Sequence, residues 1–302
     1  CLYFQDVLKQ YLHPNNSCRD REPDATVDDK EENISLAFFE LANSPRVGFR
    51  TNFQDGVSSN NSASHGSSSA SSAIVVYQDT SACEKHTGGI VWETSYLLLQ
   101  YLLAAKSELG ITLEVGAGCG LLGQVLAAHN GLCEKVVMTE TEEVMDNLKA
   151  NVERNQRNQE KDNGEKDISL KKKKKKSARV TTLEVEQLDW EHVERDVQRA
   201  AHLEPHSCDT IVGTDVIFSP KLVEPLLKTL RYMSHSRTNI YLCLQERCAV
   251  SHQLLLEKAP VYGFDMSEIT DELSSIPSCR WGQSLECRVF HIVLATASAQ
   301  KE

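Results

Sequence analysis

Short apolar runs alternate with amphipathic stretches along the chain from about residue 76 to its end. The apolar runs predict strands at 112–115, 135–139, 180–188, 210–213, 239–244 and 288–295. Between them, apolar positions recur at helical spacing and predict helices at 92–103, 121–130, 142–155, 221–233 and 254–259. Strands that alternate with helices are joined by right-handed crossovers into a parallel sheet. We therefore expect one α/β domain at residues 76–302, with a mostly parallel sheet and helices on both faces.

Residues 1–75 lack this periodicity. Residues 20–32 are strongly acidic, and residues 54–73 are rich in Ser, Asn and Gly. Segments of this kind bury too little apolar surface to offset the entropy that a chain loses on folding. We therefore predict a largely disordered N-terminal extension with one or two strands, at 34–41 and 74–77.

A polar insertion at 156–177 separates a predicted helix from a predicted strand, and it ends in six lysines, Lys171 to Lys176. Loops accept insertions at low cost, so a solvated, disordered insertion is the simplest interpretation. A nuclear address or an RNA-binding patch is the alternative. Outside this run a nucleic-acid partner is not expected, because the net charge of −11 opposes binding to a phosphate backbone and favours a basic partner.

The chain carries no apolar run of 18 residues, so we expect no transmembrane helix and no membrane association. The segment from Cys1 to Gln5 has neither the basic region nor the long apolar stretch of a signal peptide. The ten cysteines form no Cys-x-x-Cys pair, and no His cluster lies at zinc spacing. We therefore expect free thiols, no metal and a reducing compartment, which is the cytoplasm or the nucleus.

A glycine-rich turn follows the predicted strand at 112–115 and reads Glu114-Val115-Gly116-Ala117-Gly118-Cys119-Gly120. Glycines let the backbone turn sharply and approach a cofactor without an intervening Cβ. The next strand ends at Glu140, whose carboxylate can accept hydrogen bonds from both hydroxyls of a ribose. Together these features predict a nucleoside cofactor, and a glycine turn without a ligand is the simpler alternative.

The same turn also spells Gly118-x-Gly120-x-x-Gly123, the fingerprint of dinucleotide binding. Two observations weigh against NAD: the glycine nearest the strand is Gly116, two residues earlier, and Glu114 lies inside the strand just before the turn. A carboxylate beside the turn does not favour a pyrophosphate. It favours a cofactor that carries an ammonium and a sulfonium, which is S-adenosylmethionine.

Four motifs give the chain a resemblance to a known family: 88–93 (GGIVWE), 113–120 (LEVGAGCG), 188–190 (LDW) and 213–218 (GTDVIF). With them, the region from about residue 88 to 294 resembles the seven-β-strand protein lysine methyltransferases. It is most similar to the methyltransferase-like 21 and 22 group of methyltransferase family 16. The resemblance implies a Rossmann-like, seven-stranded S-adenosylmethionine-dependent methyltransferase fold. It also implies an enzyme that transfers methyl to a lysine of a protein partner. Separately from the resemblance, we expect a monomer.

The resemblance also implies roles for individual residues. The positions that match cofactor-binding residues are Trp92, Gly116, Ala117, Gly118, Glu140, Trp190 and Thr214, to which we add Glu114 from its place beside the turn. Asp215 and Phe218 match the signature near the target amine. Three positions depart from the family pattern, because Glu140 replaces Asp, Thr214 replaces Ala, and Phe218 replaces a Tyr whose hydroxyl is therefore missing.

Simpler interpretations exist for several of these residues. Trp92 lies on an apolar helix and can be a core residue, and Glu140 can cap a helix. Glu246 and Arg247 can form a surface ion pair of little energetic value, or they can serve the substrate. We expect Asp215 to orient the amine and Phe218 to wall the slot. A small-molecule methyltransferase and a non-catalytic scaffold are the alternatives. The absence of an Asn/Asp-Pro-Pro-Tyr motif disfavours methylation of adenine N6 or glutamine.

Overall fold

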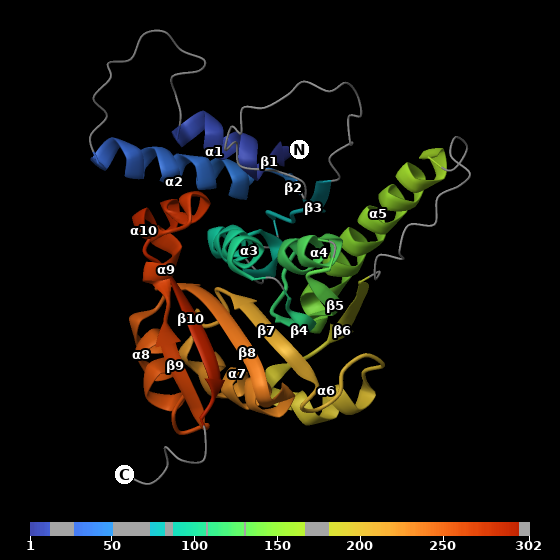
Figure 1. The fold of residues 1–302 in the computed structure, drawn as a ribbon, viewed down its shortest axis with the longest axis vertical. Helices are drawn as coiled ribbons and strands as arrows, with labels where there is room; N and C mark the ends of the chain where they lie inside the picture. Colours follow the sequence, from blue (N-terminus) through green and yellow to red (C-terminus); the bar gives the residue numbers. More distant parts are fainter. Residues whose placement is uncertain are drawn as a thin grey trace, which may run out of the picture.

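The computed structural model describes residues 1–12, 27–50, 73–81, 87–106, 108–129, 131–166 and 181–295. Its centre is a seven-stranded sheet in the order β6-β5-β4-β7-β8-β10-β9 (Figure 1). The strands are β4 (Gly110–Val115), β5 (Cys133–Glu140), β6 (Thr182–Gln187), β7 (Cys208–Thr214), β8 (Ser234–Gln245), β9 (Phe264–Glu268) and β10 (Cys287–Leu294). The first five in sequence pair in parallel, whereas β10 runs antiparallel to β8 and β9. The predicted α/β fold with a mostly parallel sheet is therefore confirmed.

Helices cover both faces of the sheet. One layer consists of α3 (Glu93–Ala105), α4 (Leu121–Ala128) and α5 (Glu142–Lys166), and the other of α6 (Val193–Arg199), α7 (Pro220–Met233) and α8 (Ala249–Lys258). Strand β8 shows why both layers are needed: Ile240 and Leu242 pack into the core under α7, while Tyr241 and Cys243 pack into the core under α3. A strand buried on both sides reads as a continuous apolar run, as this one does. None of the described helices is long and apolar enough to span a bilayer.

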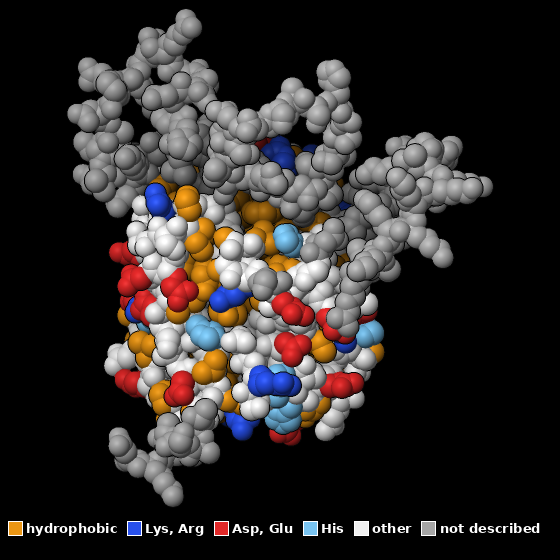
Figure 2. All heavy atoms as spheres, in the orientation of Figure 1, with side chains coloured by type: hydrophobic (Ala, Val, Ile, Leu, Met, Phe, Trp, Pro, Cys, Tyr) orange, Lys and Arg blue, Asp and Glu red, His pale blue; other side chains and the backbone are white. Residues whose placement is uncertain are grey.

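Shorter elements complete the domain. These are η3 (Thr87–Gly89), η4 (Trp190–His192), α9 (Thr270–Ser274), η5 (Pro277–Cys279) and α10 (Trp281–Ser284). Helix α5 extends eleven residues beyond the predicted end at 155, and the lysine run lies outside the described residues. On the face drawn in Figure 2, acidic and basic side chains are interspersed.

The N-terminal part of the chain contains more structure than the sequence suggested. It forms β1 (Leu2–Tyr3), α1 (Phe4–Leu12), α2 (Val27–Asn43), β2 (Arg46–Arg50) and β3 (Ala73–Tyr77). The three strands form a second small sheet in the order β1-β2-β3. The prediction of a largely disordered extension is wrong for these described segments, while residues 13–26 and 51–72 lie outside the description.

The predicted strand at 34–41 is also wrong, because this segment lies in α2. Its buried residues Ile34, Ala37, Phe38 and Leu41 recur at the spacing of a helix. The predicted strand at 74–77 is confirmed as part of β3. The extension packs on the α3 layer through aromatic rings, and the rings of Phe4 and Tyr96 stack at 4.3 Å between centroids.

Strand β3 is joined to the main domain by asparagines of α5. Asn151 accepts a hydrogen bond from the Tyr77 amide at 2.8 Å and donates one to the Tyr77 carbonyl at 3.0 Å. Asn155 makes the same pair of bonds with Val75, at 3.2 and 2.9 Å. The two asparagines are one helical turn apart, and the two strand residues they meet are alternate residues of β3. Their amide groups thus take the place of a neighbouring strand.

Candidate active site

A cavity lies at the carboxyl ends of β4, β5 and β7. It has a volume of about 550 Å³, which is within the usual range for a small-molecule site. Strand β4 has β5 on one side and β7 on the other, so the chain reverses its winding direction here. Open α/β sheets bind ligands at such a switch point.

The structure brings nearly all of the predicted site residues to this cavity. Those that line it are Trp92, Gly116, Ala117, Gly118, Glu140, Trp190, Thr214, Asp215 and Phe218. They come from the start of α3 and from the segments that follow β4, β5, β6 and β7. Residues separated by more than a hundred positions in the chain thus meet at one edge of the sheet.

Glu114 is the exception, because it does not line the cavity. Its side chain is buried, and Oε2 accepts a hydrogen bond from the Gly123 amide at 2.9 Å. Burial, opposed by the Gly123 amide and assisted by the nearby Glu140 carboxylate, raises the pKa of Glu114 to about 8. A neutral, buried acid does not attract a cationic cofactor. The electrostatic argument drawn from Glu114 in the sequence is therefore wrong.

The turn after β4 owes its shape to backbone that favours glycine. Gly118 has a φ of 55° and Gly120 a φ of 78°, both in the left-handed region. A Cβ on Gly118 would lie 3.4 Å from the Gly88 carbonyl, and one on Gly120 would clash with Leu148. The turn therefore passes close to its neighbours and leaves an open edge toward the cavity.

Glu140 ends β5 and is held by the turn that it faces. Its Oε1 accepts a hydrogen bond from the Gly118 amide at 2.9 Å, and its Oε2 accepts one from the Thr141 amide at 2.8 Å. The carboxylate and the glycine turn are thus fixed relative to each other. This acid stands in the cavity wall, where a ribose of a nucleoside cofactor would be bound.

Two tryptophans line the cavity from different elements. Trp92 caps the start of α3, and its indole donates a hydrogen bond from Nε1 to the Thr87 carbonyl at 3.1 Å. Trp190 lies in η4, and its ring is 3.5 Å from the position that a Cβ on Gly116 would take. Flat aromatic walls of this kind suit a nucleobase or a cationic group.

The segment before Trp92 is fixed by a residue that the sequence analysis did not single out. Gln78 donates from Nε2 to the carbonyls of Leu41 at 2.9 Å and Ser44 at 2.6 Å, and its Oε1 accepts from the Val91 amide at 2.5 Å. This buried amide therefore links the end of α2 to the residue preceding Trp92. No local sequence pattern signals the role, since the partners are far apart in the chain.

Asp215 follows β7 in a left-handed conformation, with a φ of 51°. Its side chain is only 5% exposed, and Oδ1 accepts a hydrogen bond from the Gln245 amide at 2.8 Å. Burial raises the pKa of Asp215, whereas Arg247 and the Gln245 amide lower it. Such strained backbone is found at functional sites, where surrounding contacts hold it in place. Phe218 stands nearby in the wall, 44% exposed.

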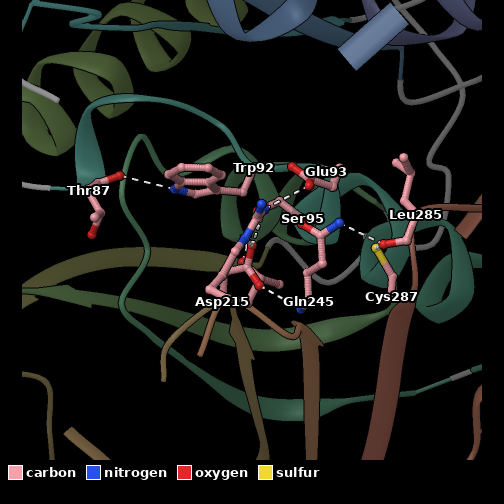
Figure 3. Close-up of polar contacts among 10 residues, drawn as sticks. Thr87, Trp92, Glu93, Ser95, Asp215, Gln245, Leu285 and Cys287 are labelled. Atoms are coloured by element: carbon pink, nitrogen blue, oxygen red, sulfur yellow. Dashed lines mark hydrogen bonds and ion pairs between the residues drawn. The ribbon is translucent and has the colours of Figure 1, made fainter. Parts of the chain in front are cut away.

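Arg247 approaches the same carboxylate from the end of β8. Its NH2 lies 2.9 Å from Asp215 Oδ2 and 2.7 Å from Glu93 Oε1, and its guanidinium lies over the Trp92 ring at 4.8 Å from the centroid. Figure 3 shows how Trp92, Glu93 and Asp215 are grouped around these contacts. The sequence had suggested a pair between Glu246 and Arg247. The signal for the observed pair was the place of Asp215 and Arg247 after two neighbouring parallel strands.

Thr214 takes part in a second polar contact across the cavity wall. Its hydroxyl lies 2.9 Å from the Ser95 hydroxyl of α3. The alanine expected at this position from the family pattern could not make this bond. The bond therefore ties the end of β7 to the first turn of α3.

Among the described residues that line the cavity, the charged side chains are all acidic. Five acidic residues line it, namely Glu140, Glu143, Asp189, Glu191 and Asp215, and among the described lining residues there is no Lys, Arg or His. A cation gains from such a wall, whereas a pyrophosphate would be repelled. No group of three His, Cys, Asp or Glu side chains in the described ranges is placed to hold a metal ion.

The fold and the cavity, taken with the family match that follows, define a Rossmann-like, S-adenosylmethionine-dependent methyltransferase. A sequence model described as lysine methyltransferase matches residues 69–258, which is well over half of the chain. The chain therefore belongs to the lysine methyltransferase family. The resemblance noted from the sequence is confirmed at this level, while membership of the methyltransferase-like 21 and 22 group stays a prediction.

Solved structures show more distant likenesses. The CurJ carbon methyltransferase is 13% identical, with a TM-score of 0.41 over 66% of this chain and 54% of that one, so only about half of that chain is matched. A precorrin-6y C5,15-methyltransferase from Geobacter metallireducens GS-15 is 11% identical, with a TM-score of 0.39 over 66% and 86%. The YcgJ protein from Bacillus subtilis is 9% identical, with a TM-score of 0.40 over 68% and 100%. Likenesses this distant carry no argument about the substrate.

Proposed function

We propose that this enzyme transfers a methyl group from S-adenosylmethionine to a lysine side chain of a protein substrate. The observation that carries the proposal is the cavity wall, in which five carboxylates and three aromatic rings line the cavity, while Arg247, which pairs with Asp215, stands outside the lining. Both reactants suit this wall, since the cofactor carries a sulfonium and an ammonium, and the methylated amine becomes a cation. The family match supports lysine as the acceptor.

The residues present fit the cofactor. The turn from Gly116 to Gly118 carries no side chain larger than the methyl group of Ala117, and Glu140 would accept hydrogen bonds from the ribose hydroxyls. Trp190 would lie against the base from the side of η4. When bound, S-adenosylmethionine supplies a methyl group on a positively charged sulfur.

The protein's own contribution begins with the amine. A free lysine has a pKa near about 10.4, so its proton must leave before the nitrogen can attack. The Phe218 ring disfavours the ammonium form, whereas the carboxylate of Asp215 favours it, so the amine gives its proton to bulk solvent before it attacks. The amine lone pair then forms the N–C bond as the S–C bond breaks, and the bonding electrons stay on sulfur.

Asp215 would orient the amine by accepting a hydrogen bond at the cavity wall. The Phe218 ring would contact the cationic product, a contact worth about 0.5–2 kcal/mol. Alignment of this kind accounts for about 7–11 kcal/mol of a barrier in favourable cases. The main task of the site is therefore to place the amine in line with the S–C bond.

The experiment that tests the proposal is incubation with radiolabelled methyl donor and a lysate of the source cells, followed by mass spectrometry of labelled bands. Label on a protein lysine supports the proposal, and label confined to small molecules favours the small-molecule alternative. Absence of transfer despite binding of S-adenosylhomocysteine in calorimetry would indicate a non-catalytic scaffold. The same titration with NAD tests the oxidoreductase alternative.

Two variants make this experiment sharper. Asp215→Asn keeps an acceptor for the Gln245 amide but removes the charge, so we expect transfer to be lost and S-adenosylhomocysteine to bind nearly as before. Asp265→Asn, at an exposed position of β9, is the matched control and should leave transfer unchanged. Localisation to the cytoplasm or nucleus and a monomeric state remain predictions.

A further inference from the structure

Arg247 connects three parts of the cavity mouth that come from different strands and helices. Its guanidinium reaches Asp215 after β7, Glu93 in the first turn of α3, and the ring of Trp92 just before that helix. The side chain is 32% exposed, so two thirds of it is covered. Planar guanidinium groups bind carboxylates and stack on rings at the same time, which a lysine cannot do equally well.

The contacts of Asp215 show what this arrangement leaves for a substrate. Each carboxylate oxygen has two acceptor positions. On Oδ2, Arg247 donates from NH2 at 2.9 Å and from Nε at 3.3 Å. On Oδ1, the Gln245 amide takes one position at 2.8 Å. The described contacts therefore occupy both positions on Oδ2 and one on Oδ1, and the remaining acceptor position is on Oδ1.

Arg247 balances the negative charge around Asp215. Glu93 faces Asp215 from α3, the thiols of Cys243 and Cys287 face it from β8 and β10, and Arg247 is the cation among these neighbours. Without Arg247, two largely covered carboxylates would face each other. Such a pair is unstable as two anions, and one of them would take up a proton.

We propose that Arg247 is a positioning residue for methyl transfer, which occupies Oδ2 of Asp215 and thereby directs Oδ1 toward the target amine. The inference rests on the proposed lysine methylation. Arg247 does not touch the reacting atoms in this account. It fixes the carboxylate, opposes the rise in its pKa that burial causes, and contacts Trp92 and Glu93 at the mouth of the cavity.

The test uses the full chain with Arg247→Gln and Arg247→Lys. The matched control is Arg288→Gln, because Arg288 also pairs with a glutamate, Glu268, but on β9 and β10. We measure kcat and KM for the acceptor found by the labelling experiment, and the affinity for S-adenosylhomocysteine by calorimetry. Circular dichroism and unfolding in urea verify that each variant is folded.

The expected result is a fall in kcat of about 10- to 100-fold in Arg247→Gln, which corresponds to the loss of a charged hydrogen bond. KM and the S-adenosylhomocysteine affinity should stay within about threefold, Arg247→Lys should recover part of kcat, and Arg288→Gln should resemble wild type. A lower KM with unchanged or higher kcat would overturn the inference, because Arg247 would then compete with the incoming amine. Loss of S-adenosylhomocysteine binding would also overturn it.

A second measurement does not depend on the acceptor. Carboxyl ¹³C NMR, with Asp215→Asn to assign the signal, follows the titration of Asp215 in the complex with S-adenosylhomocysteine. We expect the pKa of Asp215 to rise in Arg247→Gln, since the guanidinium lowers it in the wild type. An unchanged titration would refute the role of Arg247. If the wild type labels no lysine but the pKa of Asp215 still rises in Arg247→Gln, the proposed function alone is refuted.

Discussion

Glu114→Gln separates two accounts of the acid in the glycine motif. The sequence suggested a carboxylate that faces the cofactor, whereas the structure places a buried acid against the Gly123 amide, with a pKa of about 8. Glutamine has nearly the same shape as a protonated glutamate, and its side-chain oxygen can accept the same hydrogen bond. The substitution therefore removes the titration without removing the contact.

The size of the effect follows from the pKa. In the unfolded chain this acid titrates at its ordinary value of 4.5, and in the folded chain at about 8. Between these values the folded state holds a proton that the unfolded state has released, so the free energy of unfolding falls as the pH rises. The slope is about 1.4 kcal/mol per pH unit, which amounts to about 5 kcal/mol over the interval. The stabilising contribution is complete below pH 4.5 and is lost as the pH passes 8.

The assay is unfolding in urea at several pH values between 5 and 8.5, for the wild type and Glu114→Gln. At pH 5 we expect the two to agree within about 1 kcal/mol, and at high pH we expect the variant to be more stable by several kcal/mol. Calorimetry at pH 7 should show equal affinity for S-adenosylhomocysteine. Parallel pH dependence of the two proteins, or a tenfold loss of affinity in the variant, would refute the buried, neutral state of Glu114.

Three further predictions concern the cavity wall and the segments that support it. Glu140→Ala should weaken S-adenosylhomocysteine binding by about 10- to 100-fold in calorimetry, because a charged acceptor is lost. The control Glu142→Ala, at an exposed position two residues later, should bind as the wild type does. Equal affinities of the two variants would contradict the ribose role of Glu140. Gly120→Ala should destabilise the protein by about 2–5 kcal/mol in urea unfolding, from a left-handed φ plus a clash with Leu148. Gly131→Ala has the same kind of φ but open space, so it should cost only about 1–2 kcal/mol, and equal costs would exclude the clash. Gln78→Ala should lower the free energy of unfolding by about 1–3 kcal/mol and weaken S-adenosylhomocysteine binding. Gln78→Glu should show the same losses, because a carboxylate cannot donate to the carbonyls of Leu41 and Ser44.

The sequence was informative wherever chemistry and periodicity are local. The strand, the glycine turn and the next strand-end acid lie within thirty residues, and parallel strands bring their carboxyl ends to one edge. This is why Gly116, Glu140 and Asp215 could be assigned to one cavity in advance. The third glycine, Gly123, was visible in the motif, but its reason is packing, since a Cβ there would clash with Glu114 and Met138.

The sequence was less informative where contacts join distant segments. The apolar residues of α2 lie in an acidic stretch, and they become a core only when Tyr96 and Trp281 supply the opposite surface. Arg247 could be paired with its neighbour Glu246 from the sequence, and the sheet order instead brings it to Asp215. The direction in which the Glu114 side chain points also depends on the packing of the folded chain. A strand residue faces one side or the other, and only the neighbours on that side decide its charge.

The asparagines that hold β3 have a chemical consequence of their own. Each side-chain amide offers one donor and one acceptor to one backbone peptide, so an aspartate at either position would set an oxygen against the carbonyl of Val75 or Tyr77. Deamidation of Asn151 or Asn155 would make that same exchange. The changed protein would hold β3 less firmly. Gln78, which follows directly on that strand and binds the Val91 amide, would then be less well positioned. Asn151 also donates to the carbonyl of Cys119, which lines the cavity, so the same exchange would disturb the glycine turn as well as β3.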